Sequence, residues 1–289
     1  MKKIQIIDVR SIKADSGFLI DDGETSVLCD SGYAFTGKEV ADNIKKALGT
    51  RELDYIFLTH SHYDHAAGAA YVLEAYPNAK VVAGEHAANV FKKESAKRVM
   101  RKLDRKFADT CGYGAYDDLL HNLRVDICVN DGDIIKAGNM TFEAIWLPGH
   151  TRCSVGFYLK EEKLLLSTET IGVYVDSETV IPAYLVGYNM TLESIEKVSK
   201  LDIENMLIPH YGILDRIEAE QYLKTSKKSV IETANNFINI IKQNGTKADA
   251  LEYFKQQFYH GYAKEIYPID ALELNTSIMI DLTEKELIP

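Results

Sequence analysis

The residues best suited to chemistry lie in one short segment, THSHYDH, which spans Thr59 to His65. The segment holds three histidines and one aspartate, and it directly follows the apolar run DYIFL. Imidazole and carboxylate groups are the ligands that zinc, iron and manganese take in proteins. Because a short apolar run indicates a buried strand, the segment is expected to form the loop after that strand and the start of a helix.

The spacing within this segment predicts two groups of metal ligands. In an extended loop His60 and His62 point to the same side, whereas Asp64 and His65 lie where the chain turns into the helix. Two groups can then converge on neighbouring points, and two ions about 3.5–4 Å apart can hold a hydroxide between them. The alternative, a chance gathering of surface or core histidines, is disfavoured by so dense a pattern.

The pattern HxHxDH after an apolar strand resembles the metallo-β-lactamase superfamily. Four other segments are similar to further motifs of that family, in the same order along the chain: CDSG at Asp30, LPGHT at His150, STET at Glu169 and IPHYG at His210. The resemblance therefore covers most of the chain up to residue 212. It implies an α/β fold of the α+β kind, the four-layer αββα sandwich of the family.

The resemblance also implies the ligands of two divalent ions, zinc first, with iron or manganese as alternatives. The implied ligands are His60, His62 and His150 for one ion, and Asp64, His65 and His210 for the other. Glu169 would lie between the ions, and Asp30 would orient a ligand histidine without touching metal. The family has aspartate where Glu169 stands. Because glutamate is one methylene longer, the number of ions and the way in which this residue bridges them stay open.

The activity implied is hydrolysis of a small ester, thioester or lactone by a metal-bound hydroxide. Asp64 would handle the proton as well as bind metal. Tyr188 is the second catalytic candidate, because a phenol can donate a hydrogen bond to an oxyanion. Packing is the alternative role for Tyr188 and for Tyr211, and His86 is expected to be structural because it lies outside the ligand pattern.

Other functions stay open at this point. A phosphodiester could take the place of the ester as substrate. A mononuclear iron oxidoreductase of the same superfamily, similar to the persulfide dioxygenases, would use two histidines and one acid. A non-catalytic binding protein could also keep the fold.

The surrounding sequence indicates two parts, a mixed α/β body over residues 1–216 and a helical extension over residues 217–289. The extension resembles those of the glyoxalase II-like hydrolases. Within these parts the local signals predict several elements. They are a hairpin turn at 21–23, a helix over 65–76, a helix over 191–200 with Thr191 as its N-cap, and a helix that begins with a capping box at Thr246.

Residues 92–121 interrupt the body with a basic helical piece and the loop CGYGAYDD, which together could form a lid. Arg98, Arg101, Lys102 and Arg105 recur at helical spacing, so they could face an anionic substrate. The alternative is a charged face in water.

Composition limits the partners. The chain has 289 residues, a net charge of −10 and a pI of about 5.3, and this acidity argues against a general nucleic-acid binder. No apolar run is long enough to span a membrane, and the first residues alternate like a strand, unlike a secretory signal. With four scattered cysteines, these features predict a cytoplasmic protein with a small-molecule substrate and leave a homodimer open.

Overall fold

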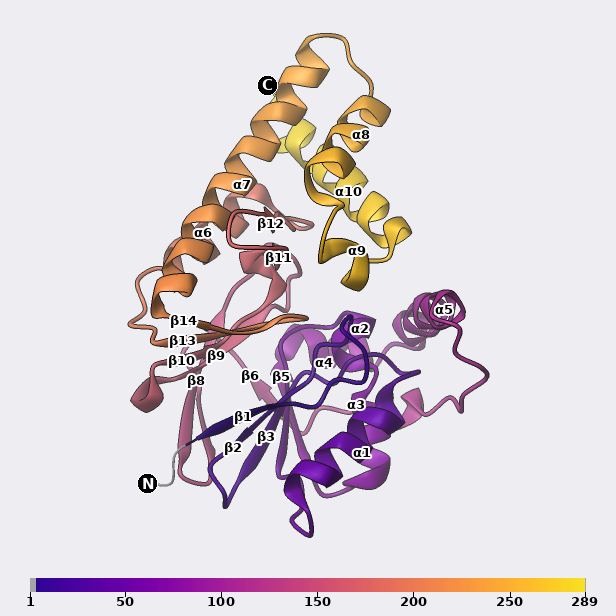
Figure 1. The fold of residues 1–289 in the computed structure, drawn as a ribbon, viewed down its shortest axis with the longest axis vertical. Helices are drawn as coiled ribbons and strands as arrows, with labels where there is room; N and C mark the ends of the chain where they lie inside the picture. The colour runs from indigo at the N-terminus through magenta and orange to yellow at the C-terminus, as the bar shows by residue number, and fades with distance from the viewer. Residues whose placement is uncertain (1–3, 289) are drawn as a thin grey trace.

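The computed structural model describes residues 4–288 and contains two six-stranded sheets packed face to face (Figure 1). The first sheet begins with an antiparallel β1–β2–β3 meander and continues with parallel strands. Its strands, in spatial order, are β1 (Gln5–Asp8), β2 (Phe18–Asp21), β3 (Ser26–Cys29), β4 (Tyr55–Leu58), β5 (Lys80–Gly84) and β6 (Ile127–Val129). The predicted turn at 21–23 joins β2 to β3.

The second sheet is antiparallel except where β10 and β13 run parallel. In spatial order its strands are β14 (Gly212–Asp215), β13 (Asn205–Ile208), β10 (Leu164–Leu166), β9 (Val155–Leu159), β8 (Met140–Trp146) and β7 (Ile134–Ala137). A separate pair, β11 (Val173–Tyr174) and β12 (Val180–Ile181), lies beneath the C-terminal helices.

The core between the sheets is built from alternate residues of both. Phe57 of the first sheet packs against Phe142 and Phe157 of the second, with ring centroids 5.1 and 4.6 Å apart. Two further clusters of buried apolar side chains lie on the outer faces of the sheets, under the helices. The order helix, sheet, sheet, helix confirms the predicted αββα sandwich.

Helices cover the outer faces and extend above one end of the sheets. The helices of the first half are α1 (Gly37–Leu48), α2 (Tyr63–Ala66), α3 (Ala69–Ala75), α4 (Glu85–Phe91) and α5 (Glu94–Thr110). Those of the second half are α6 (Tyr188–Val198), α7 (Arg216–Lys242), α8 (Lys247–Phe258), α9 (Ala263–Ile266) and α10 (Ile269–Leu287). Within residues 4–288, single 3-10 turns lie at Leu120–Asn122, Lys160–Glu162 and Glu169–Ile171.

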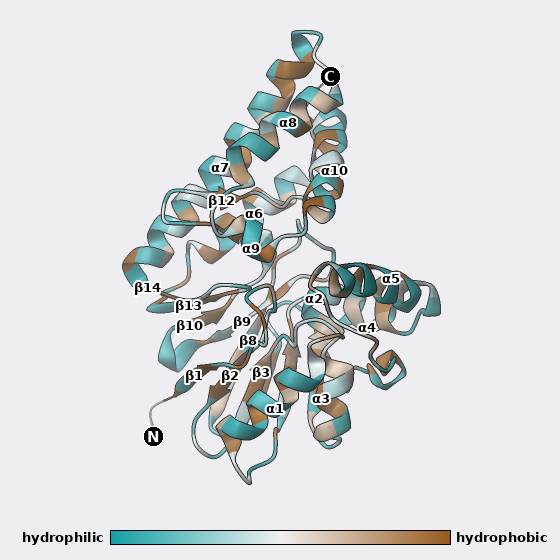
Figure 2. Ribbon diagram, turned by 45° about the vertical axis from the view of Figure 1, so that its right-hand side comes forward, coloured by the Kyte–Doolittle hydropathy of each residue, from teal (hydrophilic) through white to brown (hydrophobic). Residues whose placement is uncertain are grey.

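The segment after β14 is helical, as the sequence predicts. α7 starts with a capping box, in which Asp215 accepts from the backbone of Glu218 and Glu218 accepts in return. The capping box predicted at Thr246 is confirmed, with Asp249 as its partner. α7 and α10 show alternating teal and brown along their length in Figure 2, which fits amphipathic helices packed on one another. The division of the chain into two domains stays a prediction.

Two predicted helix boundaries are wrong. The helix expected over 65–76 is two helices, α2 and α3, separated near Gly68. A Cβ at Gly68 would lie 2.0 Å from the carbonyl oxygen of Ser31, so the chain approaches the loop after β3 too closely for another residue. Thr191 is no N-cap, because α6 starts at Tyr188 and the Thr191 hydroxyl donates to the Gly187 carbonyl inside the first turn.

None of the helices over residues 4–288 combines the length and apolar character needed to cross a bilayer.

Candidate metal centre

The segment Thr59–His65 leaves the carboxyl end of β4 and runs into α2. Asp30, which directly follows the neighbouring strand β3, fixes the start of this loop. One oxygen of Asp30 accepts from the Thr59 amide at 2.8 Å, and the other accepts from the Thr59 hydroxyl at 2.9 Å. The loop therefore leaves the sheet in one orientation, with His60 buried directly after the strand.

The distant candidates also follow the carboxyl ends of strands. His150 comes after β8, Glu169 after β10 and His210 after β13. Gly149 adopts a φ of 144°, and a Cβ there would lie 2.2 Å from the Thr191 hydroxyl, so only glycine lets the chain deliver His150 at this point. Three strands of the second sheet and β4 of the first thus bring their loops to one place.

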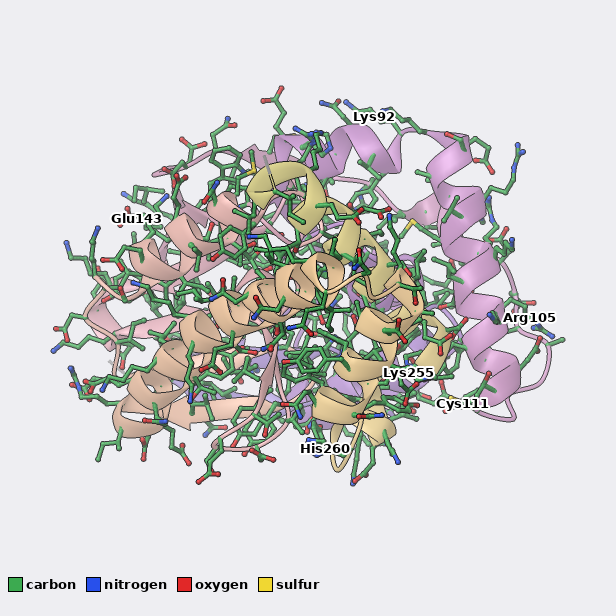
Figure 3. The ribbon with its side chains drawn as sticks, turned by 90° about the horizontal axis from the view of Figure 1, so that it is seen from above. Lys92, Arg105, Cys111, Glu143, Lys255 and His260 are labelled. Carbon is green, nitrogen blue, oxygen red and sulfur yellow. The ribbon has the colours of Figure 1, made fainter. Side chains whose placement is uncertain are left out.

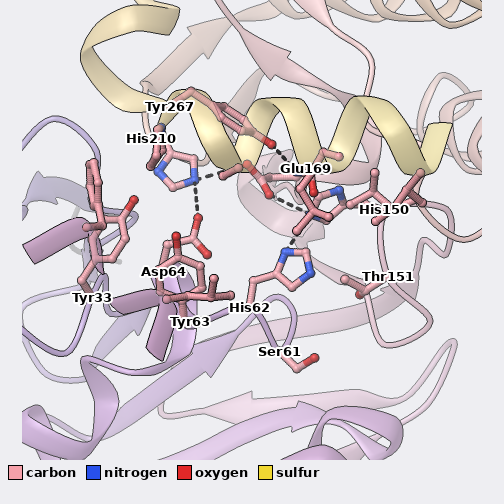
Figure 4. A pocket seen from close by; sticks show the side chains of 18 of the residues that line it. Tyr33, Ser61, His62, Tyr63, Asp64, His150, Thr151, Glu169, His210 and Tyr267 are labelled. Carbon is pink, nitrogen blue, oxygen red and sulfur yellow. Dashed lines mark hydrogen bonds and ion pairs between the residues drawn. The ribbon is translucent and has the colours of Figure 1, made fainter. Parts of the chain in front are cut away.

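The seven side chains meet in two groups, and within each group the donor atoms lie within 4.8 Å of one another. Figure 4 shows five of them, His62, Asp64, His150, Glu169 and His210, facing the cavity. One group is His60, His62, His150 and Glu169, and the other is Asp64, His65 and His210. The predicted ligands are therefore gathered as the two implied sets.

Glu169 faces both groups. Its Oε2 lies 2.9 Å from His150 Nε2 and 3.6 Å from His65 Nε2, and its Oε1 lies 3.3 Å from His210 Nε2. Burial alone would raise the pKa of Glu169, but the surrounding histidines lower it well below its usual range. An anionic oxygen donor consequently stands between two sets of nitrogen donors, despite the extra methylene.

Hydrogen bonds on the outer side of the rings set which nitrogen faces inward. His65 Nδ1 lies 2.7 Å from Asp30, His210 Nδ1 lies 2.8 Å from the Ala14 carbonyl, and His150 Nδ1 lies 3.1 Å from the Ala183 carbonyl. Each Nδ1–H donates outward, so the Nε2 lone pair points into the cluster. Asp30 thus contacts a histidine of the cluster, which is the role that the sequence predicts.

The inward-facing ring nitrogens are better placed to bind metal ions than to form hydrogen bonds with one another. His65 Nε2 lies 3.1 Å from His210 Nε2, and His62 Nδ1 lies 3.0 Å from His150 Nε2, so neighbouring nitrogens aim at shared points. His60 Nε2 is buried and has no hydrogen-bond partner among the described residues. A buried polar atom without a partner is costly unless something binds it.

The protonation states of two rings agree with this, whereas at His65 burial lowers the pKa but Asp30 and Asp64 raise it well above its usual range, so a metal ion would displace a proton there. Burial, reinforced by the neighbouring histidines, lowers the pKa of His60 well below its usual range. The same causes lower the pKa of His62 to about 3. Both rings are therefore neutral at pH 7, which is the form that ligates metal.

A cavity of about 470 Å³ opens from the cluster and runs between α5 and the C-terminal helices. The metal end is lined by His62, Asp64, His150, Glu169 and His210. The far walls come from α5 and from the segment 266–278. The centre thus has room beside it for a small organic molecule.

Two tyrosine candidates are not where catalysis would need them. Tyr188 is absent from the cavity lining, and its ring packs edge-on against Tyr184 with centroids 5.6 Å apart. Tyr211 packs against Tyr174 at 4.0 Å and does not line the cavity either. The catalytic role of Tyr188 stays a prediction without support from this geometry, since the ring packs into the helix layer beside Tyr184.

The basic face of α5 also points elsewhere. None of Arg98, Arg101, Lys102 and Arg105 lines the cavity. Arg101 pairs with Glu94 and Asp118, and Figure 3 shows Arg105 at the outer edge of the molecule, turned away from the C-terminal helices. α5 borders the cavity through its opposite face, so the alternative of a charged face in water holds for these four residues.

Two cavity residues differ from the sequence-based expectation. His86 is exposed and lines the cavity, so it is not the packed structural histidine that was expected. Tyr267, which sequence reasoning missed, lines the cavity from the segment before α10. No motif surrounds Tyr267, and only the folding-back of the C-terminal helices brings it within reach of the cluster (Figure 4).

The family model of the metallo-beta-lactamase superfamily matches residues 16–210, which hold all seven clustered side chains. The chain belongs to the metallo-beta-lactamase superfamily. Most members of this superfamily are hydrolases, and membership together with the cluster implies that the protein binds divalent metal.

Relatives and solved structures agree with this membership. Hydroxyacylglutathione hydrolases of Francisella tularensis subsp. holarctica and Francisella philomiragia are 29% and 28% identical, over 157 and 186 residues. These matches cover 52% and 61% of this chain, and they span only 46% and 57% of the relatives.

Among solved structures, a metallo-beta-lactamase family protein of Thermus thermophilus has a TM-score of 0.62 at 15% identity, covering 98% of this chain and 93% of that one. A superfamily protein of Sulfolobus tokodaii has a TM-score of 0.59 at 21% identity, covering 78% and 86%. At these identities the structures support the fold alone.

Proposed function

We propose that the protein is a dinuclear metal-dependent hydrolase that cleaves small esters, thioesters or lactones. The observation that carries this proposal is the pairing of two donor groups with Glu169 facing both. A single iron ion held by two histidines and one acid would leave several of the seven side chains without a metal ion to bind. His60, His62 and His150 would hold one ion. Asp64, His65 and His210 would hold the other, and Glu169 would reach both.

The names of the relatives favour a thioester among these substrates. The Francisella proteins are named for the hydrolysis of hydroxyacylglutathione, in which an acyl group is carried on sulfur. Bound divalent ions supply Lewis acidity, which polarises a carbonyl oxygen and activates water for attack. Zinc is the ion we propose first, since imidazole and carboxylate donors of this number suit it.

Asp64 is suited to hold a proton during the reaction. It lines the cavity, and its carboxylate lies 3.8 Å from the Nε2 atoms of both His65 and His210. Burial raises its pKa above the usual range, which brings it closer to values at which it exchanges protons near neutral pH. We therefore keep Asp64 as both ligand and proton carrier.

We propose that Tyr267 takes the role expected of Tyr188. The Asn275 amide donates to the Tyr267 hydroxyl oxygen at 2.5 Å, so the phenolic proton itself stays available for another acceptor. Burial, followed by the Glu169 carboxylate, raises the pKa of Tyr267, which therefore remains a neutral donor at pH 7. We propose that its O–H donates to the carbonyl oxygen of the substrate.

The direct test is hydrolysis of a panel of acyl thioesters, aryl esters and lactones by protein loaded with zinc. Turnover that is lost on chelation and regained when zinc is restored is the expected result. Metal-loaded protein that cleaves none of the panel would contradict the proposal. Phosphodiesters and a persulfide assayed beside the panel would then show whether one of the other superfamily chemistries applies.

A further inference from the structure

One wall of the cavity lies outside the part of the chain that matches the family. The family match ends at residue 210, whereas α9 and α10 begin at Ala263 and Ile269. These helices and the turn between them supply a large share of the cavity lining: Ile266, Tyr267, Pro268, Asp270, Ala271, Leu274, Asn275 and Ile278. The substrate that this wall accepts therefore has to be inferred from its own residues.

The wall is apolar away from the metal end. Leu274 and Ile278 of α10 line it, and Leu103 and Phe107 of α5 line it from the other side. Leu274 is 55% exposed, so much of its aliphatic side chain is in contact with water beside the cavity. A ligand that covers Leu274 removes this apolar surface from water, and that is a favourable change.

The charges on this wall cancel one another. Lys106 of α5 forms a salt bridge with Asp270 of α10, and both residues line the cavity. The other cationic side chain of the described lining, Arg152, lies two residues after the metal-end His150. A carboxylate carried far out on a substrate chain would therefore meet no unpaired cation between α5 and α10.

We propose that the space between α5 and α10 holds an uncharged, apolar acyl chain, so that the substrate is a thioester, ester or lactone of such an acyl group. This inference rests on the proposed hydrolase function and names the substrate class of that same site. The reacting carbonyl would lie at the metal end beside Tyr267, and the chain would extend past Leu274 towards Ile278. Acyl groups that end in a carboxylate would be poor substrates.

The test compares thioesters of one leaving group that differ only in the acyl chain: acetyl, butyryl, hexanoyl, and adipoyl with a free terminal carboxylate. The value of kcat/KM is expected to rise about twofold to fourfold per added methylene from acetyl to hexanoyl. It should fall at least about tenfold from hexanoyl to adipoyl, because the buried carboxylate finds no partner. Equal values along the neutral series, or adipoyl as good as hexanoyl, would overturn the inference.

Two matched variants test whether the preference for longer neutral acyl chains comes from this wall. Leu274→Asn keeps a similar side-chain volume and should lower the ratio of hexanoyl to acetyl kcat/KM about tenfold. Ile217→Asn is the control, because Ile217 is 78% exposed on α7 and does not line the cavity. The control should keep the wild-type ratio, and an unchanged ratio in Leu274→Asn would contradict the assignment.

A binding measurement separates this inference from the proposed function. If metal-loaded protein cleaves no thioester, aryl ester or lactone, the hydrolase proposal fails. The wall is then tested with N-phenyl-1-naphthylamine, a neutral apolar fluorophore. Binding that Leu274→Asn weakens at least about fivefold, and Ile217→Asn does not, would support the apolar site. No binding, or equal binding to all three proteins, would overturn it.

Discussion

The two ends of the cavity are built in different ways. At the metal end, every side chain follows the carboxyl end of a strand, and hydrogen bonds to Asp30, Ala14 and Ala183 fix the ring orientations. At the far end, the side chains come from two helices that belong to different halves of the chain, and they meet through packing and one exposed salt bridge.

This difference separates the reaction from the choice of substrate. Strand ends in a close-packed sandwich hold ligands rigidly, which suits chemistry that a family shares. Helix faces can change their side chains without disturbing the sheets, so the substrate can change while the centre is kept. Tyr262, directly before α9, ties the C-terminal helices to the metal end, because its hydroxyl donates to the carbonyl of His210 at 2.5 Å.

The largest effect is expected at the metal end. His62→Ala removes a donor that faces His150 at 3.0 Å, so bound metal should fall and turnover should drop by about a thousandfold or more. Metal content by elemental analysis and kcat on the best thioester check this. The control is His260→Ala, since His260 is exposed, lies outside the cluster, and its ring bonds to the Gln257 carbonyl. Full metal and full activity in His62→Ala would break the assignment of the centre.

The second prediction concerns how α5 is attached to the body. Asp104 of α5 is buried, accepts from the Ala34 amide at 2.7 Å, and has a pKa that burial raises to about 6. Between its usual value of 3.8 and 6, the folded state binds more protons than the unfolded state, so this group lowers stability as pH rises.

Asp104→Asn removes that titration. Its free energy of unfolding relative to the wild type should increase by about 2 kcal/mol between pH 4 and pH 7, measured by urea denaturation. Asp109→Asn, on the exposed side of the same helix, is the matched control. Parallel stability profiles for Asp104→Asn and the wild type would show that the carboxylate is not buried as described.

The third prediction tests whether the C-terminal helices contribute to chemistry. Tyr267→Phe should lower kcat about a hundredfold while metal content stays at the wild-type level, because only a hydrogen-bond donor is lost. Asn275→Leu should lower kcat by a smaller factor, since it acts by positioning the phenol. Tyr188→Phe serves as the comparison and should stay within about twofold of wild type. Equal losses in the two tyrosine variants would refute the replacement of Tyr188 by Tyr267.

The smallest effect is expected at the salt bridge across the cavity. The side chains of Lys106 and Asp270 are 62% and 43% exposed, and exposed ion pairs contribute about 0.2–1 kcal/mol. Lys106→Met should therefore change KM for a neutral substrate less than about threefold, and its effect should shrink further in high salt. A change above about tenfold would mean that the bridge controls entry to the cavity.

The metal end was predictable because its chemistry is local. His60, His62, Asp64 and His65 lie within a single turn of chain, and an apolar strand precedes them. The far end was not predictable, because Tyr267 and Leu274 reach the cavity only after the chain turns back from the far end of α7 towards the body. The single helix predicted over 65–76 is wrong for the same reason. The break near Gly68 is caused by close approach to the Ser31 carbonyl, which belongs to a loop far away in the sequence. Contacts between segments that are far apart in the sequence leave no periodic pattern in it.

The most direct test of the account is the metal content per chain, measured on the same preparation as thioester hydrolysis while zinc is titrated into metal-free protein. The account predicts that activity rises with loading and levels off at two ions per chain, with Glu169→Ala unable to reach that level. Full activity at one ion per chain, or two bound ions without hydrolysis of any acyl substrate, would contradict a dinuclear hydrolase.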